Sequence, residues 1–339
     1  GHLPKGAILR TSMPKPRMIL RRGRNTSLEF STIYPDPSSH VMLPPGFRAQ
    51  LPTLASHSST SNTRPPTLLL NTCHYNTMFT LTPRLTKPGL FITATGTEMG
   101  KTVVTCALAC NLRGRGLRIG VSKPIASACR TEPEGLVNTD AEALAHFANS
   151  GHPLHVINPI RYEAPLAPAV AAEQTGQSPD FDVIKHALEL VDLDSDAVLV
   201  EGVGGLLVPI HPTQPTVTVL DLAKFLGYPV LVVAAAGLGT LNHTSMTIRL
   251  LRHAGCRVAG VVMNDCPSAV QRNHAVDKDP SLTNNREWLE KMNDTRVLAT
   301  VPQCPADLVA PAQGRLPRSI LEAMDQDHWL EVLEVPMNS

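Results

Sequence analysis

The sequence predicts an α/β fold in which a doubly wound, mainly parallel β-sheet is flanked by helices. From Lys87 onward, short apolar runs alternate with segments of helical periodicity. Several of these runs are continuous, rich in Val and too short for helices, as in strands that are buried on both faces. Strands that alternate with helices are typical of parallel sheets with right-handed crossovers. Such sheets bind their ligands at the carboxyl ends of the strands.

The expected elements follow one another along the chain. We expect strands at residues 89–95, 117–122, 197–200, 229–235, 257–263 and 297–301. We expect helices at residues 101–113, 140–148, 182–193, 240–254, 285–293 and 318–332. Asn138 and Thr139 are candidate N-caps for the helix that starts at Asp140. Residues 89–339 are therefore predicted to form one α/β domain.

The first 88 residues, here called the extension, differ in composition from the rest. They hold 12 of the 30 prolines and eleven Lys and Arg residues, against only Glu29 and Asp36. Their formal charge is +9 and that of the remaining chain is −8, so the net charge of +1 hides a basic extension on an acidic body. This Pro-rich and Ser-rich composition predicts that most of the extension is disordered.

Two further interpretations of the extension stay open. An Arg-rich, Ser-rich and acid-poor N-terminus is typical of an organelle transit peptide, although Pro4, Pro14 and Pro16 would interrupt its amphipathic helix. Alternatively, the gene start is over-extended and translation begins at Met78, eleven residues before the first expected strand. We favour this last interpretation because the ordered pattern begins so soon after Met78.

Composition also argues against several functional classes. No run of 18 apolar residues is present, so we expect no membrane partner. The acidic body offers no basic surface to a nucleic acid. Seven cysteines, without a C-x-x-C pair or a His at metal spacing, argue against a disulfide framework and a zinc site. A reducing, cytoplasmic compartment is therefore expected.

The strongest local signal is the segment at residues 95–102 (TGTEMGKT), here called the phosphate loop. It follows the first expected strand and opens the first expected helix, with Thr95 in place of the usual first glycine. Backbone N–H groups at the helix N-terminus would hold phosphates, Lys101 would reach the β and γ oxygens, and the Thr102 hydroxyl would bind Mg²⁺. The segment predicts a P-loop NTPase-like fold that binds the phosphates of a magnesium nucleotide.

Three charged residues lie where other elements reach the same edge of the sheet. Glu201 ends an apolar run and precedes residues 202–205 (GVGG), so a buried carboxylate would open onto glycines that admit a phosphate. Asp140 opens a helix and by itself would be only a partner of the helix dipole. Lys123 ends the second expected strand and either approaches the transferred phosphoryl group or extends to solvent.

These residues belong to a longer resemblance to the dethiobiotin synthetases of the biotin pathway. The matching segments, in the family's order and spacing, are FITATGTEMGKT (91–102), KPIAS (123–127), PEGLVNTDAEAL (133–144), APLAPAVAAE (164–173), VLVEGVGGLLVP (198–209), PVLVVAAAGLGTLNH (229–243) and GVVMND (260–265). They cover about residues 89–305. The extension lies outside the resemblance, and the tail after Pro305 matches weakly.

The resemblance implies a reaction and its partners. 7,8-Diaminononanoate, CO₂ and MgATP would give dethiobiotin, ADP and phosphate through a carbamate and then a carbamic-phosphoric anhydride. The enzyme would be an ATP-dependent cyclo-ligase that forms C–N bonds. The resemblance also implies a homodimer with the diamine at the subunit interface, near residues 242–243 and 165–168.

The resemblance assigns one set of residues to the nucleotide and its metal ion. Contacts around the phosphates would come from Glu98, Met99, Gly100, Lys101, Thr102, Val103, Gly202, Val203 and Gly204. Contacts around the adenine would come from Asn264, Asp265, Pro302, Gln303 and Cys304. The residues that would serve Mg²⁺ are Thr102, Asp140 and Glu201.

A second set is implied to act on the reacting atoms. Lys123 matches the family's catalytic Lys, and Lys101 would act beside it on the phosphates. Thr97 would touch the carbamate and the phosphate, and Ser127 matches a Ser that contacts the substrate. Because phosphoryl transfer depends mainly on positioning and charge neutralisation, two lysines and Mg²⁺ would supply what it needs.

The chain departs from the family pattern at three positions. Ala94 stands where many members have Gly, and Gly96 stands where some have Asp. Both changes alter the packing of the phosphate loop. Ala128 stands where a Gly usually follows the Ser, and its methyl group is expected to narrow the diamine pocket.

Two alternative functions share the phosphate loop. ParA-like and MinD-like regulatory ATPases carry a signature Lys five residues before the loop Lys, a position that Gly96 occupies here. Cobyrinate synthases of the amidotransferase type need a glutaminase domain with a Cys nucleophile, for which no room remains. Both are therefore less well supported than a dethiobiotin synthetase.

Overall fold

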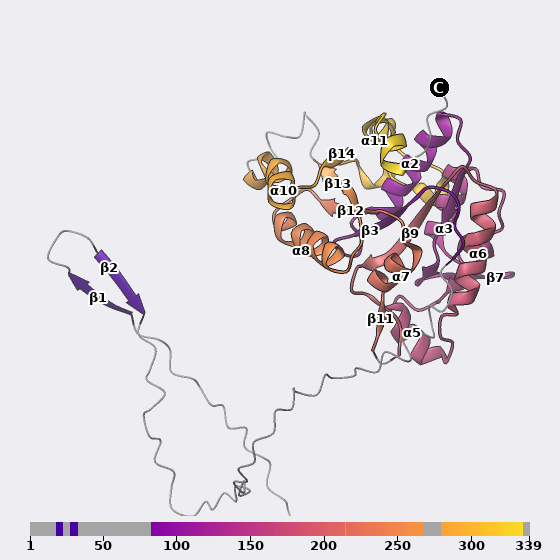
Figure 1. The fold of residues 1–339 in the computed structure, drawn as a ribbon, viewed down its shortest axis with the longest axis horizontal. Helices are drawn as coiled ribbons and strands as arrows, with labels where there is room; N and C mark the ends of the chain where they lie inside the picture. The colour runs from indigo at the N-terminus through magenta and orange to yellow at the C-terminus, as the bar shows by residue number, and fades with distance from the viewer. Residues whose placement is uncertain (1–17, 23–27, 33–82, 214, 267–278, 335–339) are drawn as a thin grey trace, which may run out of the picture. The chain divides into compact units, whose positions relative to one another are not determined.

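The structure, a computed structural model, describes residues 18–22, 28–32, 83–213, 215–266 and 279–334. The chain divides into two units, Gly1–Thr67 and Leu68–Ser339. In the first unit, β1 (Met18–Arg22) and β2 (Leu28–Thr32) form an antiparallel pair, which the sequence analysis did not anticipate. Residues 83–88 of the extension are described as well, and the remainder of the segment predicted to be disordered falls outside the described residues. All other described elements belong to the second unit (Figure 1).

The second unit is built on a six-stranded sheet in which every pairing is parallel. Its order is β14 (Val297–Pro302), β13 (Val258–Cys266), β12 (Val230–Ala235), β3 (Gly89–Ala94), β9 (Ala197–Gly205) and β4 (Ile119–Ser122). The chain starts in the middle at β3, adds β4 and β9 on one side, and then builds the other side. The strand order thus reverses at β3, where such sheets bind ligands. The predicted fold class is confirmed.

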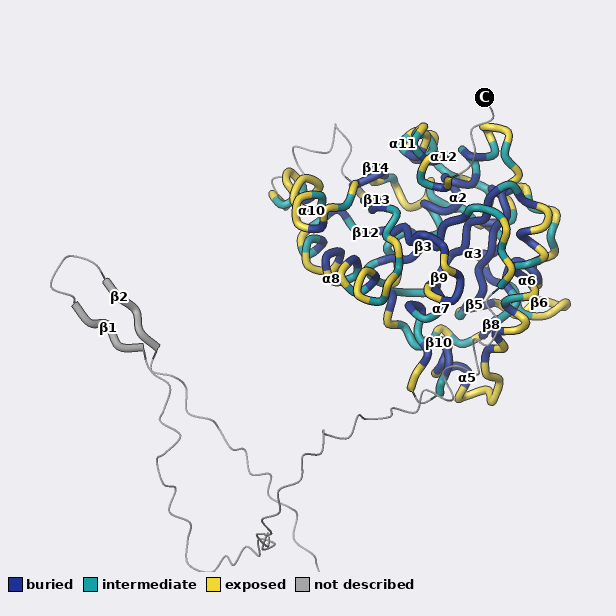
Figure 2. Tube along the Cα trace, in the orientation of Figure 1, coloured by how far each residue is buried: buried dark blue, intermediate teal, exposed yellow. Residues whose placement is uncertain are grey.

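Helices cover both faces of this sheet (Figure 1). One face packs against α2 (Lys101–Gly114), α3 (Thr139–Ala148), α11 (Arg318–Met324) and α12 (Trp329–Leu333). The other face packs against α6 (Phe181–Leu193), α7 (Val219–Leu226), α8 (Thr240–His253) and α10 (Asn285–Asn293). Strand residues alternate between the two cores: Phe91 of β3 joins one, whereas Leu90 and Ile92 join the other. The strands are accordingly buried on both faces (Figure 2).

Several short elements were not predicted. The helices are α4 (Leu154–Ile157), α5 (Pro168–Thr175) and α7, with the 3₁₀ turns η1 (Pro280–Thr283), η2 (Ala306–Leu308) and η3 (Pro311–Gln313). The strand pairs are β5 (Ile125–Ala126) with β8 (Ile160–Arg161), β6 (Arg130–Glu132) with β7 (Gly135–Val137), and β10 (Pro209–His211) with β11 (Val217–Thr218). Most are too short for hydrophobic periodicity to predict them.

The predicted helix at residues 318–332 is wrong in one respect, because the structure divides it into α11 and α12. Asp325 leaves the helical conformation, with φ −84° and ψ 80°. Its carboxylate lies 2.8 Å from the guanidinium of Arg115, which also binds Asp327 at 2.8 Å. A contact with a residue distant in sequence therefore accompanies the interruption of the helix.

The second unit includes residues that precede β3. The backbone N–H and the hydroxyl of Thr86 donate to Oδ2 of Asp192 at 2.9 and 2.7 Å, and the Lys87 N–H donates to Oδ1 at 2.9 Å. Asp192 belongs to α6 and is buried. The segment at residues 86–87 thus provides hydrogen-bond donors to a buried carboxylate.

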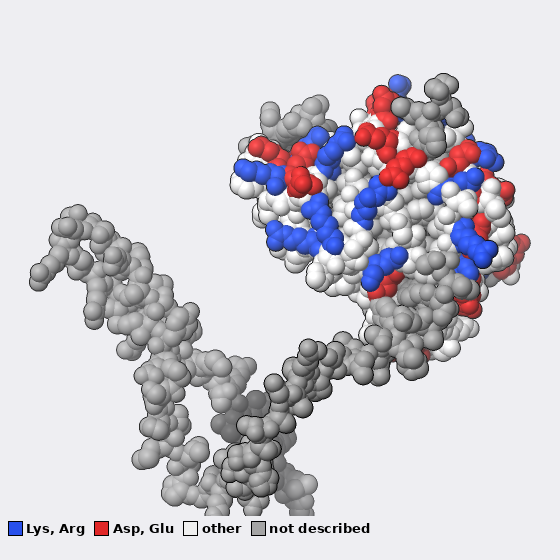
Figure 3. Space-filling model, viewed as in Figure 1, with Lys and Arg blue, Asp and Glu red and all other residues white. Residues whose placement is uncertain are grey.

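The surface of the second unit is mixed in charge. On the face drawn in Figure 3, Lys and Arg side chains are interspersed with Asp and Glu side chains. None of the helices in the described residues has the length and apolar character needed to cross a membrane.

Candidate active site

The phosphate loop joins β3 to α2 at the point where the strand order reverses. Gly100 is the N-cap of α2 and has φ +88°, a conformation that favours glycine. A Cβ atom at this position would lie 2.0 Å from the amide nitrogen of Asn264. No side chain caps α2, so its first-turn N–H groups can bind an anion, as the sequence predicts.

A cavity of about 690 Å³, here called the first cavity, lies beside the phosphate loop. Segments far apart in sequence form it, among them the phosphate loop, the end of β5, the start of α3, the segment before α5 and the end of β9. The predicted site residues that line it are Thr97, Glu98, Gly100, Lys101, Thr102, Val103, Lys123, Ser127, Asp140, Val203 and Gly204. The other lining residues include Ala128, Asn138 and Pro165–Pro168. The structure thus brings most of the predicted phosphate and substrate residues together.

Lys123 is the centre of a charged cluster at one end of this cavity. Its ammonium nitrogen lies 2.6 Å from Oε1 of Glu201 and 2.8 Å from Oδ2 of Asp140. The Thr102 hydroxyl donates to the same oxygen of Glu201 at 3.0 Å. Lys123 follows β4 and Glu201 lies on β9, and these two strands are paired neighbours. Lys123 is therefore a buried ion-pair partner and does not extend to solvent.

The pKa values of the two lysines are shifted in opposite directions. Burial and, next, the positive charge of Lys123 lower the pKa of Lys101 to about 8. Burial alone would lower the pKa of Lys123 too, but Glu201 and Asp140 outweigh it and raise that pKa above its usual value. Burial would raise the pKa of Asp140, yet Lys123 outweighs it and lowers that pKa. Lys123 and Asp140 are therefore both charged near neutral pH.

The oxygen atoms around Lys123 fit a magnesium ion. Asp140 and Glu201 supply carboxylates, and Thr102 supplies a hydroxyl. Oε2 of Glu201 is buried without a hydrogen-bond partner, so one carboxylate oxygen is left to bind a cation. The part of the chain that the structure describes has no cluster of three or more His, Cys, Asp or Glu side chains suited to a metal. Two carboxylates completed by water and phosphate oxygens are nevertheless a usual Mg²⁺ environment.

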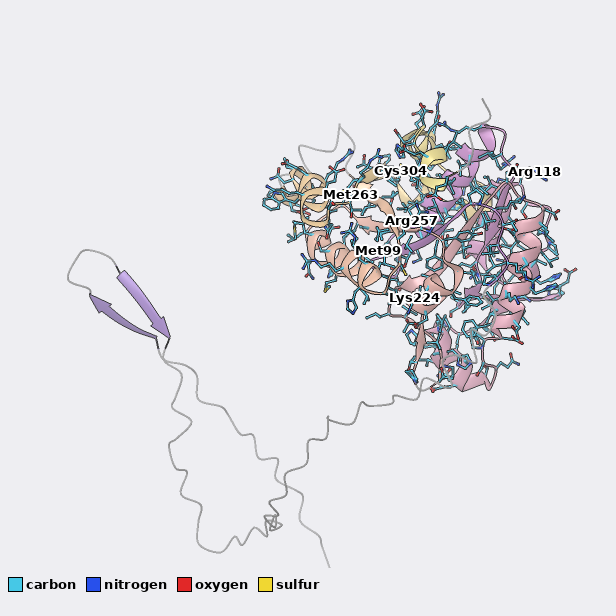
Figure 4. The ribbon with its side chains drawn as sticks, viewed as in Figure 1. Met99, Arg118, Lys224, Arg257, Met263 and Cys304 are labelled. Atoms are coloured by element: carbon cyan, nitrogen blue, oxygen red, sulfur yellow. The ribbon has the colours of Figure 1, made fainter. Side chains whose placement is uncertain are left out.

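A second cavity of about 410 Å³ lies on the other side of the phosphate loop. The predicted adenine residues that line it are Asn264, Asp265, Pro302 and Cys304, together with Met99. Figure 4 labels Met99 and Cys304. Glu98 and Val103 line both cavities, so the two spaces meet at the phosphate loop. The residues predicted for the phosphates and for the adenine thus line two adjoining cavities.

A few residues lie elsewhere than the sequence suggests. Glu201 and Gly202 are buried behind the wall of the first cavity. Gln303 is exposed and lines neither cavity. His243 lines a third cavity of about 490 Å³ with Thr95, Gly96 and Thr97. Asn138 was predicted only as an N-cap candidate, and no sequence signal placed it in the first cavity.

Comparison with known proteins identifies the family. A family profile described as "AAA domain" matches residues 88–311. The ATP-dependent dethiobiotin synthetase of Anaeromyxobacter sp. (strain Fw109-5) is 46% identical over 177 residues, which cover 52% of this chain and 76% of that protein. The chain belongs to the dethiobiotin synthetase family. The family member from Pseudescherichia vulneris is 32% identical over 244 residues, covering 71% of this chain and 90% of its own length.

Solved structures were compared as well. The MinC:MinD cell division protein complex of Aquifex aeolicus covers 73% of this chain and 94% of its own, with 12% identity and a TM-score of 0.42. Both sequence relatives described above are ATP-dependent dethiobiotin synthetases. The resemblance inferred from the seven sequence segments is confirmed, as is the use of ATP by the family to which the chain belongs.

Proposed function

We propose that this chain converts 7,8-diaminononanoate, CO₂ and MgATP into dethiobiotin, ADP and phosphate. The observation that carries the proposal is that two ammonium groups and the Thr102 and Asp140 side chains line one cavity beside an uncapped helix N-terminus, with the buried Glu201 bonded to Lys123 and Thr102. Lys101 and Lys123 supply the positive charges, and Thr102, Asp140 and Glu201 supply the oxygens. Such a site neutralises the charge on a transferred phosphoryl group.

The reaction would proceed in three bond-forming steps. One amine of the substrate attacks CO₂ and loses a proton, which gives a carbamate. A carbamate oxygen then attacks the γ-phosphorus, and ADP leaves. Finally the second amine attacks the carbonyl carbon of the mixed anhydride, loses a proton and expels phosphate, which closes the ring.

The residues of the chain would divide this work between them. Lys101 would compensate charge on the β and γ phosphates from the first turn of α2. Lys123, kept charged by its two carboxylates, would face the transferred phosphoryl group, and Thr97 would contact the carbamate. Ser127 would contact the diamine, and residues 165–168, which also line the first cavity, would complete its pocket.

Thr102, Asp140 and Glu201 would hold Mg²⁺ when it is bound with ATP. The ion would supply positive charge to the phosphate oxygens. We also infer a reducing, cytoplasmic compartment, which is supported by the five unpaired cysteines among the described residues.

We further propose that the enzyme acts as a homodimer through the third cavity. Its lining includes the exposed apolar side chains of Leu207 and Met246, with 64% and 55% of their surface accessible. Large apolar side chains gathered at one surface often mark an interface. Because Thr97 lines both this cavity and the first, a second subunit here would lie next to the reaction site. Light scattering at micromolar concentration should give the mass of a dimer; a monomer with full activity would refute this.

The alternative is a regulatory ATPase of the MinD type. Against it, Gly96 occupies the position of the signature Lys of those proteins. The two functions differ in what triggers ATP hydrolysis. We expect ADP release only when ATP, bicarbonate and diaminononanoate are all present, and little when any one is omitted. ADP release that is independent of the diamine would support the regulatory ATPase.

A further inference from the structure

Asn138 connects two parts of the first cavity that are separate in sequence. It is 6% exposed and precedes α3 as its N-cap. Its side-chain oxygen accepts the backbone N–H groups of Asp140 at 3.0 Å and Ala141 at 3.3 Å. Its side-chain nitrogen donates to the backbone carbonyl of Ser127 at 3.3 Å. One amide therefore binds both the helix turn that carries Asp140 and the loop that carries Ser127.

The loop that Asn138 contacts is conformationally strained. Ala128 has φ +56°, in the left-handed region that residues with a Cβ atom rarely adopt. The backbone groups of residues 127–129 make three hydrogen bonds. The Ala128 and Cys129 N–H groups donate to the carbonyls of Ala164 and Tyr162 at 3.3 and 3.0 Å, and the Ser127 carbonyl accepts from Asn138. Of these three, only the bond from Asn138 is made by a side chain; next to them, the Ala126 carbonyl accepts from the Tyr162 N–H at 2.9 Å and from the Cys129 thiol at 3.8 Å.

The strained loop also presents the group expected to meet the substrate. Ser127 lines the first cavity, and its hydroxyl oxygen is buried without a hydrogen-bond partner. A buried hydroxyl without a partner is costly unless a ligand or water satisfies it. Its position depends on the backbone of residues 127–129, which in turn depends on the hydrogen bonds described above.

We infer that Asn138 is a positioning residue for the diamine. Its amide nitrogen holds residues 127–129 in the strained conformation that presents Ser127, and its amide oxygen holds the first turn of α3. The identity of the substrate in this inference rests on the proposed function. The conformation of the loop is independent of the proposed function, because it can be measured without turnover.

Two substitutions separate the two hydrogen-bonding roles of Asn138. Asn138→Ser and Asn138→Asp both keep an N-cap oxygen, and both lose the nitrogen that donates to Ser127. They differ in charge, so an effect common to both comes from the lost donor. We expect each substitution to raise the KM for the diamine about tenfold. This factor corresponds to the loss of one hydrogen bond that contributes about 1.4 kcal/mol. The KM for ATP should stay within about twofold for Asn138→Ser.

Ala128→Gly provides the control for strain, because glycine adopts the left-handed conformation without cost. Measured in an Ala128→Gly background, Asn138→Ser should raise the diamine KM only about twofold instead of about tenfold. An equal loss in both backgrounds would mean that Asn138 does not hold the strained conformation, and this would overturn the inference. Unchanged diamine KM values in both Asn138 variants would overturn it as well.

Hydrogen exchange gives a readout that is independent of activity. Backbone N–H groups of Ala128 and Cys129 should exchange at least about tenfold faster in Asn138→Ser than in the wild type. The Ala128→Gly substitution should reduce that difference. If the wild-type protein makes no dethiobiotin, the proposed function fails, and the exchange rates still decide whether Asn138 holds the loop. Identical exchange in the wild type and in Asn138→Ser would reject the positioning role.

Discussion

The ammonium nitrogen of Lys123 lies 2.6 Å from Oε1 of Glu201, and the two side chains are only 5% and 0% exposed. Removing one partner of such a buried pair typically costs about 3–5 kcal/mol, because the other charge is left uncompensated. Glu201 and Asp140 together raise the pKa of Lys123 above its usual value. Lys123 would therefore act as a fixed positive charge near the transferred phosphoryl group.

Lys101→Gln should abolish most turnover. Lys101 lines the first cavity in the first turn of α2, where its ammonium would compensate charge on the β and γ phosphates. A neutral amide cannot do this, and loss of one preorganised charge or donor typically lowers the rate about 10²–10³-fold. Initial rates of dethiobiotin formation check the expectation. A variant that keeps more than about a tenth of wild-type activity would reject the role.

The affinity for ATP should depend on the protonation of Lys101. Burial and Lys123 lower the pKa of this residue to about 8 in the nucleotide-free protein. The phosphates of ATP favour the charged form of Lys101 and so raise its pKa. Above pH 8, ATP binding should therefore be accompanied by the uptake of a proton. The affinity for ATP should fall as the pH rises through about 8. Calorimetry at pH 9 in buffers of different ionisation enthalpy measures that uptake. It should disappear in Lys101→Gln; equal uptake by the variant would assign the proton to another group.

Glu201→Gln should impair the use of Mg²⁺ and not a proton transfer. The substitution keeps the shape of the side chain and removes its charge, so the variant should need much more Mg²⁺ and regain part of its rate as Mg²⁺ is raised. A general base would behave differently, because its loss would change the pH profile and extra metal would not help. Activity that stays flat over the Mg²⁺ titration, with a shifted pH optimum, would contradict the metal assignment.

Residues 1–77 of the extension should be dispensable for catalysis, whereas residues 86–87 at its end should contribute to stability. A protein that begins at Met78 should fold and turn over normally. One that begins at Gly89 loses three hydrogen-bond donors to the buried Asp192, and we expect its free energy of unfolding to fall by about 2–3 kcal/mol. Urea unfolding of the two truncated proteins compares them directly.

The full chain serves as the reference for this comparison. If the protein that begins at Met78 were insoluble or inactive while the full chain worked, the extension would be structural. Equal stability of the two truncated proteins would show instead that residues 86–87 contribute nothing to Asp192.

Strand ends were the most predictable part of the site. Lys123 and Glu201 each follow a short run that was expected to be a strand, and paired parallel strands bring such residues to the same edge of a sheet. The phosphate loop was equally predictable, because its glycines, Lys101 and Thr102 lie within one segment. The ion pair between Lys123 and Glu201 was not predictable, since it joins residues 78 positions apart.

Other features depend on tertiary contacts that leave no local pattern. β5 and β8 have two residues each and exist because they pair with one another across the chain. The end of α11 coincides with an ion pair between Asp325 and Arg115, which are 210 positions apart. Asn138 could be predicted as a helix cap from its sequence, but its bond to the Ser127 carbonyl depends on how the loop folds back.

The most direct test of the proposed activity supplies ¹³C-bicarbonate, ATP, Mg²⁺ and diaminononanoate to the pure protein and follows product mass and ADP together. The account predicts dethiobiotin one mass unit heavier than the unlabelled product, because its ring carbonyl comes from CO₂, with one ADP formed for each dethiobiotin. Lys101→Gln serves as the negative control. ADP formed without labelled dethiobiotin, or labelled dethiobiotin formed without ADP, would contradict the account.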